Sequence, residues 1–356
     1  MHTRIDARAR AGALALAGTL LLAGCAGGDT RPGAAPSRST APTVGGAAGQ
    51  LEQQYEKVVA DVLPSVVEIQ TDGGEGSGVV YDDRGHIVTN AHVVMGAREI
   101  EVRAANGGRP LRAELVGAFA ADDLAVVRVS GASLRPARFG DSGDLKVGQI
   151  VLAMGNPLGL SSSVTNGIVS ALNRTVSTKR EGAFPGATIG NSIQTSAAIN
   201  PGNSGGALVT LNGEVVGIPT AAASDPQMGG AAPGIGFATP SNTVKAIAPQ
   251  LIQNGRVTNS GRAALGVTIR TVVDPSTYQP AGLGVVEVTR GGPADKAGIR
   301  PDDVIVAVNG TPTPTQTALA EVLVQLKPGA TAKVEVQTPG AGRRTVDVTL
   351  GELPAS

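Results

Sequence analysis

The sequence is poor in aromatic residues and in cysteine. Only 2% of its 356 residues are Phe, Trp or Tyr, Trp is absent, and there is a single Cys. A chain with so few aromatic rings lacks the stacking platforms that bind single-stranded nucleic acid. One Cys cannot form an internal disulfide, so the fold must be stable through packing alone. Its cores must be built mainly from Val, Ile, Leu and Ala.

The sequence also lacks a net charge and recognisable metal or phosphate motifs. Lys and Arg total 29, as do Asp and Glu, so bulk electrostatics favour neither nucleic acid nor anionic lipid as a partner. With one Cys, three His and no acidic residues at ligand spacing, we expect no metal site. No phosphate-binding loop lies between a strand and a helix, and we expect no cofactor.

Glycine and aliphatic residues, by contrast, are abundant. Hydrophobic residues make up 41% of the chain, which is enough for real cores. The 50 glycines are about twice the usual share of roughly 7%, which indicates many tight turns and therefore many short strands. The length of 356 residues favours two or three domains of roughly 100–200 residues each.

The N-terminus resembles a bacterial lipoprotein signal over residues 1–25. Basic residues precede an apolar run over residues 11–23, which is shorter than the ~20 residues that span a membrane. The run ends in small residues followed by Cys25. The resemblance implies cleavage before Cys25, acylation of its sulfur, and tethering to the extracytoplasmic face of a bacterial cell membrane. The alternative is an ordinary signal peptide with an incidental Cys.

The rest of the chain divides into a linker, a β-rich region and a C-terminal unit. Residues 26–50 are rich in Gly, Ala, Pro, Ser and Thr, which predicts a flexible linker. Over residues 51–255, a helix that stops at Pro64 precedes two series of six short strand-like runs, and a short helix closes the region. This pattern predicts a mainly β fold with two six-stranded antiparallel barrels.

Two short motifs could supply a base and a nucleophile. His92 follows a predicted strand and is the strongest candidate base, because His2 lies in the signal and His86 is expected at the rim of a strand. Ser204 lies between small residues, where a tight turn would expose its hydroxyl. The N–H groups of Gly202, Asn203 and Ser204 could then form an oxyanion hole. The alternative is an ordinary glycine-rich hairpin.

A third motif offers an acid. Asp122 and Asp123 directly precede an apolar strand that begins at Leu124. A carboxylate there can orient an imidazole and stabilise its protonated form. Either residue could instead be a solvated turn residue, and physical reasoning on the sequence does not choose between them.

Together the three motifs resemble those of the HtrA/Deg family of exported serine proteases. They are the segments 89–94, 123–126 and 202–206, and their His, Asp, Ser order over two barrels is the chymotrypsin-type arrangement. In that family the acid directly precedes the Leu-Ala pair, which selects Asp123. The resemblance implies that Ser204 attacks a peptide carbonyl, His92 transfers the proton and Asp123 orients His92.

The resemblance also implies partners and an assembly. Misfolded extracytoplasmic proteins are the expected substrates, and a homotrimer is the expected assembly. The alternative is a weakly active or resting protease that acts mainly as a chaperone or scaffold. The predicted lining of the pocket for the residue before the scissile bond (S1) is uncharged and suits small aliphatic side chains. It consists of Ala198, Ile199, Ile218 and Thr220.

Residues 261–353 resemble a PDZ domain. The segment 264–267 is similar to its carboxylate-binding loop, and the following strand could pair with a C-terminal peptide. On a predicted helix, Leu319 and Leu323 would line the pocket for the last side chain, although Leu323 fits the domain core equally well. The expected peptide-binding residues are Leu265, Gly266, Val267, Ile269, Leu319 and Leu323.

Overall fold

The computed structural model describes residues 46–105, 107–156, 163–178, 181–200, 202–225 and 230–353. The predicted signal peptide with Cys25, and the predicted linker up to residue 45, lie outside the described residues. Gly46 onward forms one compact unit.

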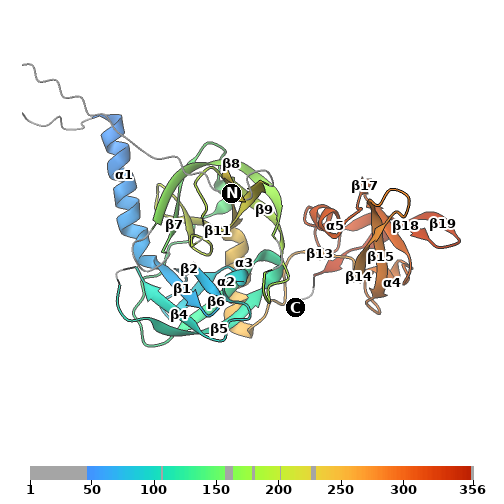
Figure 1. Cartoon of the computed structure of the whole chain (residues 1–356), viewed down its shortest axis with the longest axis horizontal. Helices are drawn as coiled ribbons and strands as arrows, with labels where there is room; N and C mark the ends of the chain where they lie inside the picture. The colour runs from blue at the N-terminus through green and yellow to red at the C-terminus, as the bar shows by residue number, and fades with distance from the viewer. Residues whose placement is uncertain are drawn as a thin grey trace, which may run out of the picture. The chain divides into compact units, whose positions relative to one another are not determined.

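The first strands of this unit form a closed antiparallel barrel (Figure 1). Its strands are β1 (Val66–Thr71), β2 (Gly74–Val80), β3 (His86–Thr89), β4 (Ile100–Ala104), β5 (Leu111–Phe119) and β6 (Leu124–Val129). Around the barrel they follow the order β1-β2-β3-β6-β5-β4. Aliphatic side chains such as Val67, Ile69 and Ile87 fill the interior and are fully buried.

A second closed barrel follows. Its strands are β7 (Ile150–Gly155), β8 (Ser163–Ser177), β9 (Thr188–Thr195), β10 (Ala207–Thr210), β11 (Val215–Asp225) and β12 (Gly230–Pro240), in the order β10-β11-β12-β9-β8-β7. Gly213, in the turn between β10 and β11, has a φ of 73°, which suits the Asn-Gly hairpin signal. The prediction of two six-stranded barrels is confirmed.

Three helices accompany the barrels. They are α1 (Ala47–Val62), α2 (Ala91–Val94) and α3 (Ser241–Asn254). Because α1 begins at Ala47, the last residues of the predicted linker are helical, which corrects its boundary at residue 50. Pro64, which lacks an N–H, falls in the 3-10 turn that ends α1. Gly255 closes α3 in a left-handed conformation, as expected.

One hydrophobic cluster joins the two barrels. It contains Val79 and Val88 of the first barrel and Leu152 and Ile218 of the second. The α1 and α3 helices add buried aliphatic side chains to the same cluster, among them Leu251. The barrels are therefore held together by burial of apolar surface, which fixes how their loops meet.

The C-terminal unit is a six-stranded sheet, in which β17 pairs with β16 off the main path, with two short helices and the separate pair β13-β20. Its elements are β13 (Ala263–Ala264), β14 (Val267–Val273), β15 (Pro280–Val288), α4 (Pro293–Lys296), β16 (Val304–Val308), β17 (Thr311–Pro312), α5 (Gln316–Leu323), β18 (Thr331–Thr338), β19 (Gly342–Thr349) and β20 (Gly351–Glu352). The main sheet has the order β14-β15-β16-β18-β19, so β14 lies at an edge. The hydroxyl of Thr315 accepts a hydrogen bond from the Ala318 N–H and caps α5.

Candidate active site

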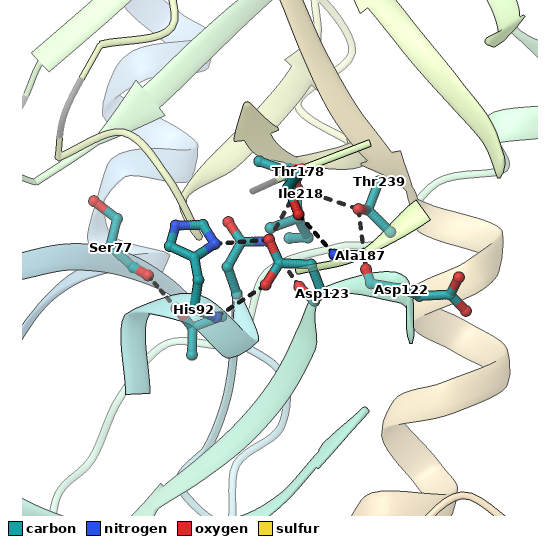
Figure 2. Close-up of polar contacts among 11 residues, drawn as sticks. Ser77, His92, Asp122, Asp123, Thr178, Ala187, Ile218 and Thr239 are labelled. Carbon is teal, nitrogen blue, oxygen red and sulfur yellow. Dashed lines mark hydrogen bonds and ion pairs between the residues drawn. The ribbon is translucent and has the colours of Figure 1, made fainter. Parts of the chain in front are cut away.

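A histidine on α2 and an aspartate between β5 and β6 form the centre of the site. The Nδ1 atom of His92 lies 2.7 Å from Oδ2 of Asp123, and the backbone N–H of His92 donates to Oδ1 at 2.9 Å (Figure 2). Asp123 has no exposed surface, and its φ of 51° is left-handed, a conformation that Asp tolerates. Both carboxylate oxygens are thus bound to the same histidine.

This arrangement defines the chemistry of the imidazole. Because a carboxylate accepts at Nδ1, that nitrogen carries the proton and Nε2 keeps a lone pair. Burial disfavours the charged ring, but the hydrogen bond and charge of Asp123, with the charge of Glu181, outweigh it and raise the pKa of His92 above its ordinary 6.5. The ring can therefore accept a proton at Nε2 and hold it.

Asn90 supports both partners and was missed at the level of sequence. It directly precedes α2, and its buried Nδ2 donates to the carbonyl of Asp123 at 2.8 Å and to the hydroxyl of Thr220 at 2.9 Å. One amide therefore ties the His92 helix, the Asp123 turn and β11 together. Its position two residues before His92 was the one hint in the sequence that Asn90 belongs to the site. That hint is weak, because hydrogen bonds to backbone carbonyls cannot be predicted from a sequence.

The two neighbouring acids point in different directions. Figure 2 shows the side chains of Asp122 and Asp123. The carboxylate of Asp122 forms an ion pair with Arg262 at 3.0 Å, and Arg262 also donates to the carbonyls of Ala121 and Thr188. Burial raises the pKa of Asp122, although Arg262 opposes the change. Only Asp123 contacts His92, so the geometry separates the alternatives that physical reasoning on the sequence left open.

Ser77 of β2 anchors the loop that carries Ser204. The N–H of Ser77 donates to the carbonyl of Ser204 at 2.8 Å, and its hydroxyl donates to the carbonyl of Gly202 at 2.5 Å. Gly205 has a φ of 82°, and a Cβ there would lie 2.2 Å from the Ser77 carbonyl oxygen. The close approach explains the glycine. Ser77 itself belongs to a different barrel and carried no signal in the sequence.

The predicted oxyanion hole needs one correction. The N–H of Asn203 donates to the carbonyl of Asn200 at 3.0 Å, so it is already engaged and does not serve as a third donor. The N–H groups of Gly202 and Ser204 have no acceptor among the described contacts. These two groups can therefore receive a developing oxyanion.

Ser204 lies beside the histidine helix. A Cβ at Gly76 would meet the Val93 side chain at 2.8 Å and the Ser204 carbonyl oxygen at 3.2 Å, so Gly76 fits between the serine and the neighbour of His92. The contacts within the described ranges include no hydrogen bond from the Ser204 hydroxyl to the His92 ring. Such bonds often tighten only in the complex with substrate.

The residues predicted for the S1 pocket do not line one common open pocket. Ala198 is exposed, and Ile199 is 7% exposed within the core of the second barrel. Ile218 has no exposed surface, because it belongs to the cluster that joins the barrels, and its assignment to the pocket is corrected. The hydroxyl of Thr220 bonds to the Ile218 carbonyl and contacts Asn90.

His86 also differs from expectation. It is 6% exposed rather than at a rim, and its Nδ1 lies 2.7 Å from Oδ2 of Asp82. Among the described residues, no group of three or more His, Cys, Asp and Glu side chains is placed to hold a metal ion. In the same ranges, every helix is too short or too polar to cross a membrane.

The predicted peptide-binding residues of the C-terminal unit fall into two groups. Leu265 and Leu319 are buried in the domain core and do not present an open surface to a peptide. Half-buried side chains lie along β14 and α5 and pack against that core; they are Val267, Ile269 and Leu323. Gly266 has a φ of 71°, which shapes the loop before β14. Gln316, whose Nε2 donates to the carbonyl of Ile269 at 3.1 Å, was not among the predicted residues.

Comparison with known proteins identifies the family. A trypsin-like peptidase domain matches residues 76–218, and a PDZ domain matches residues 263–350. The serine protease PepD of Mycobacterium tuberculosis is 42% identical over 349 residues, which cover 93% of this chain and 71% of PepD. The chain belongs to the HtrA family of serine proteases.

Other HtrA proteins are similar over shorter shares of their length. The serine protease Do-like HtrA of Bacillus subtilis is 39% identical, over 76% of this chain and 62% of the relative. A probable periplasmic DegP-like endoprotease of Halomonas elongata is 41% identical, over 79% of this chain and 57% of the relative. The chain therefore spans less than two thirds of the length of these two relatives.

Solved HtrA structures share the fold. The HtrA-type protease AlgW with a decapeptide has a TM-score of 0.57 and 30% identity, and the match covers 84% of this chain and 99% of AlgW. The serine endoprotease from Yersinia pestis has a TM-score of 0.56 and 33% identity over 84% of this chain and 98% of its own. The predicted family, barrels and PDZ domain are thus confirmed.

Proposed function

We propose that this HtrA protein is an exported serine endopeptidase that hydrolyses peptide bonds through Ser204, His92 and Asp123. The observation that carries the proposal is the pair of hydrogen bonds between Asp123 and His92. Beside it lies the serine loop, in which the N–H groups of Gly202 and Ser204 have no acceptor among the described contacts. Because Asp123 accepts at Nδ1, Nε2 of His92 keeps the lone pair that a general base needs. This arrangement supplies base, nucleophile and electrophilic donors at one place.

The reaction would proceed by acyl transfer. The Ser204 hydroxyl attacks the scissile carbonyl while Nε2 of His92 removes its proton, and the N–H groups of Gly202 and Ser204 stabilise the oxyanion. His92 then donates the proton to the leaving amine, which departs and leaves an acyl-enzyme. Water then attacks the acyl carbonyl while His92 removes its proton. The bond to Ser204 Oγ breaks, His92 returns the proton to Oγ, and the acid product leaves. Asp123 stays ionised and stabilises the imidazolium in both steps.

We further propose misfolded extracytoplasmic proteins as substrates and C-terminal peptides as ligands of the PDZ domain. The support is the edge strand β14, which can pair with an extended peptide. A lipid on Cys25 would tether the protein to the cell membrane, and a homotrimer is the assembly that the family resemblance suggests. Membrane fractionation of the wild type and Cys25→Ser tests the tether; an unchanged distribution would argue against it.

Casein degradation by the wild type and Ser204→Ala tests the catalytic proposal. Both proteins are assayed with and without a C-terminal peptide, and thermal unfolding checks that the variant is folded. We expect the variant to lose about ten thousandfold or more in rate, because the nucleophile is absent. Equal rates for the two proteins would contradict the assignment of Ser204.

A resting protease that acts as a chaperone is the second candidate. It is favoured by the lack, within the described contacts, of a hydrogen bond between Ser204 and His92. The same experiment distinguishes it. Suppression of aggregation by Ser204→Ala, together with no cleavage by the wild type even with peptide, would support the chaperone.

A further inference from the structure

A cavity of about 350 Å³ opens directly beside the imidazole of His92. Three segments surround it: the turn between β1 and β2, the residues that follow His92, and the loop between β8 and β9. Among the described residues that line it are His92, Val93, Met95, Asp72, Glu75 and Glu181. The cavity therefore adjoins the proposed base.

The position of the cavity indicates which part of a substrate it meets. Asn90, Asp123 and Thr220 are linked by hydrogen bonds on the side of the ring toward β11, and none of them lines the cavity. Of the residues predicted for the S1 pocket, Thr220 lies on β11 and belongs to this hydrogen-bonded group. The leaving amine must reach Nε2 of His92 to receive its proton. We therefore place the residues that follow the scissile bond in the cavity, on the opposite side of the ring.

The loop between β8 and β9 is held firmly against this space. Phe184 is 1% exposed in the core of the first barrel, and its ring lies 5.9 Å from that of His92. Two backbone hydrogen bonds, of 3.0 and 2.8 Å, join Glu181 to Phe184. A Cβ at Gly96 would lie 2.6 Å from the Cβ of Ala183, so the loop contacts the segment after α2. This anchoring fixes Glu181 at the cavity wall.

The charged lining is of one sign. Apart from the imidazole, the charged side chains among the described lining residues are the carboxylates of Asp72, Glu75 and Glu181, all on exposed residues. One oxygen of Asp72 accepts the backbone N–H of Arg98 at 3.1 Å. The Glu181 charge also acts on the His92 ring, where it favours the imidazolium. The charged side chains on the described part of the cavity wall therefore favour a cation.

We propose that this cavity is a subsite for the residues after the scissile bond, and that Glu181, with Glu75 and Asp72, gives it a preference for Lys or Arg. The proposal rests on the proposed protease function and adds a specificity that the uncharged S1 residues do not provide. A long basic side chain can lay its methylenes on Val93 and Met95 and bring its charge to the rim. Because the carboxylates are solvated, each pair contributes modestly.

The test uses quenched fluorescent peptides that are identical up to the scissile bond. They carry Lys, Arg, Gln or Glu at the first two positions after it, and kcat/KM is measured for each. We expect Lys or Arg peptides to exceed the Gln peptide by about fivefold, and the Glu peptide to be cleaved slowest. High salt should reduce the preference, since solvated charges are screened.

Variants assign the preference to named residues. Glu181→Gln should reduce the ratio of kcat/KM for the Lys peptide to kcat/KM for the Gln peptide. The double variant Glu75→Gln with Glu181→Gln should bring this ratio near one, whereas Glu181→Asp should retain part of the preference. Glu114→Gln, an exposed acid on β5 outside the cavity, is the matched control and should leave the ratio unchanged. The proposal would be overturned if the wild type had the same kcat/KM for the Lys and Gln peptides. It would also be overturned if the double variant kept the full preference for the Lys peptide.

Binding separates this proposal from the protease function. The Kd of the intact Lys and Gln peptides is measured by anisotropy with Ser204→Ala as the receptor. Tighter binding of the Lys peptide, abolished by the added Glu75→Gln and Glu181→Gln changes, supports the cavity even if the wild type never cleaves. Ser204-dependent cleavage without any Lys preference in rate or binding rejects the cavity and leaves the protease function intact.

Discussion

At the scale of single residues, the left-handed turn at Asp123 separates two adjacent acids. Asp123 is bound to His92, whereas Asp122 is directed to Arg262. A residue in extended conformation at position 123 would send its side chain elsewhere, so the local backbone conformation decides which carboxylate serves the histidine. Asn90 holds that conformation through the carbonyl of Asp123.

The pH dependence of cleavage should follow His92. As a base it must be neutral, so kcat/KM on a peptide without ionisable side chains should rise with pH. Burial lowers the pKa of His92, but Asp123 and Glu181 raise it to a net value above 6.5, so the half-maximum should lie above pH 6.5. Glu181→Gln should lower this midpoint, because one of the charges that favour the imidazolium is removed. A wild-type midpoint below 6.5 would contradict the prediction.

Much of the site could be predicted from short motifs, and the rest could not for a physical reason. His92, Asp123 and Ser204 lie in local patterns that a single stretch of sequence displays. Ser77 and Asn90 act through bonds to backbone atoms of distant segments. Such partners depend on how two barrels meet, and no local pattern of residue types encodes that contact.

At the scale of elements, strands were more predictable than pockets. Turn residues and short apolar runs mark each strand, so the two barrels follow from local signals. The helix α1 began earlier than expected because alanine and glutamine extend it into a segment whose composition resembled a linker. Ile218 fits an uncharged pocket by residue type, yet packing of the barrels against one another buries it in their shared core.

The edge strand β14 carries a testable element-scale feature. Gln316 at the start of α5 donates to the Ile269 carbonyl, an acceptor that an added peptide strand would use. Gln316→Ala should therefore strengthen binding of a labelled C-terminal peptide by about two- to tenfold, because one competing hydrogen bond is removed.

Fluorescence anisotropy with a peptide ending in valine measures this effect. Its C-terminal amide, which lacks the carboxylate, reports non-specific binding. Gln325→Ala, an exposed glutamine beyond the end of α5, is the matched control. Weaker binding by Gln316→Ala would show that Gln316 contacts the peptide rather than competing with it.

At the scale of the whole molecule, a buried ion pair joins the segment before β13 to the protease domain. Arg262 and Asp122 are largely buried, with side chains 15% and 8% exposed. Breaking such a pair leaves an uncompensated charge, so Arg262→Ala should lower the free energy of unfolding by about 3–5 kcal/mol at neutral pH. Urea unfolding in a Ser204→Ala background, which removes self-cleavage, measures the change.

The loss of stability caused by Arg262→Ala should depend on pH. Burial raises the folded pKa of Asp122 above 3.8, with Arg262 opposing, so its protonation stabilises the fold below pH 3.8 and this contribution disappears as pH rises through the folded pKa. The deficit of Arg262→Ala should therefore be largest at neutral pH and shrink in acid. Arg256→Ala, an exposed arginine after α3, should cause little loss at either pH. A deficit independent of pH would contradict this account.

The three residues proposed to react lie on separate barrels, and this placement has a wider consequence. His92 and Asp123 come from the first barrel and Ser204 from the second, while apolar side chains from both form the cluster between them. A chain divided between Val129 and Ile150 would yield two inert fragments, and hydrolysis would return only on their reassociation. Cleavage of a substrate by the two fragments would therefore measure how much of them has associated.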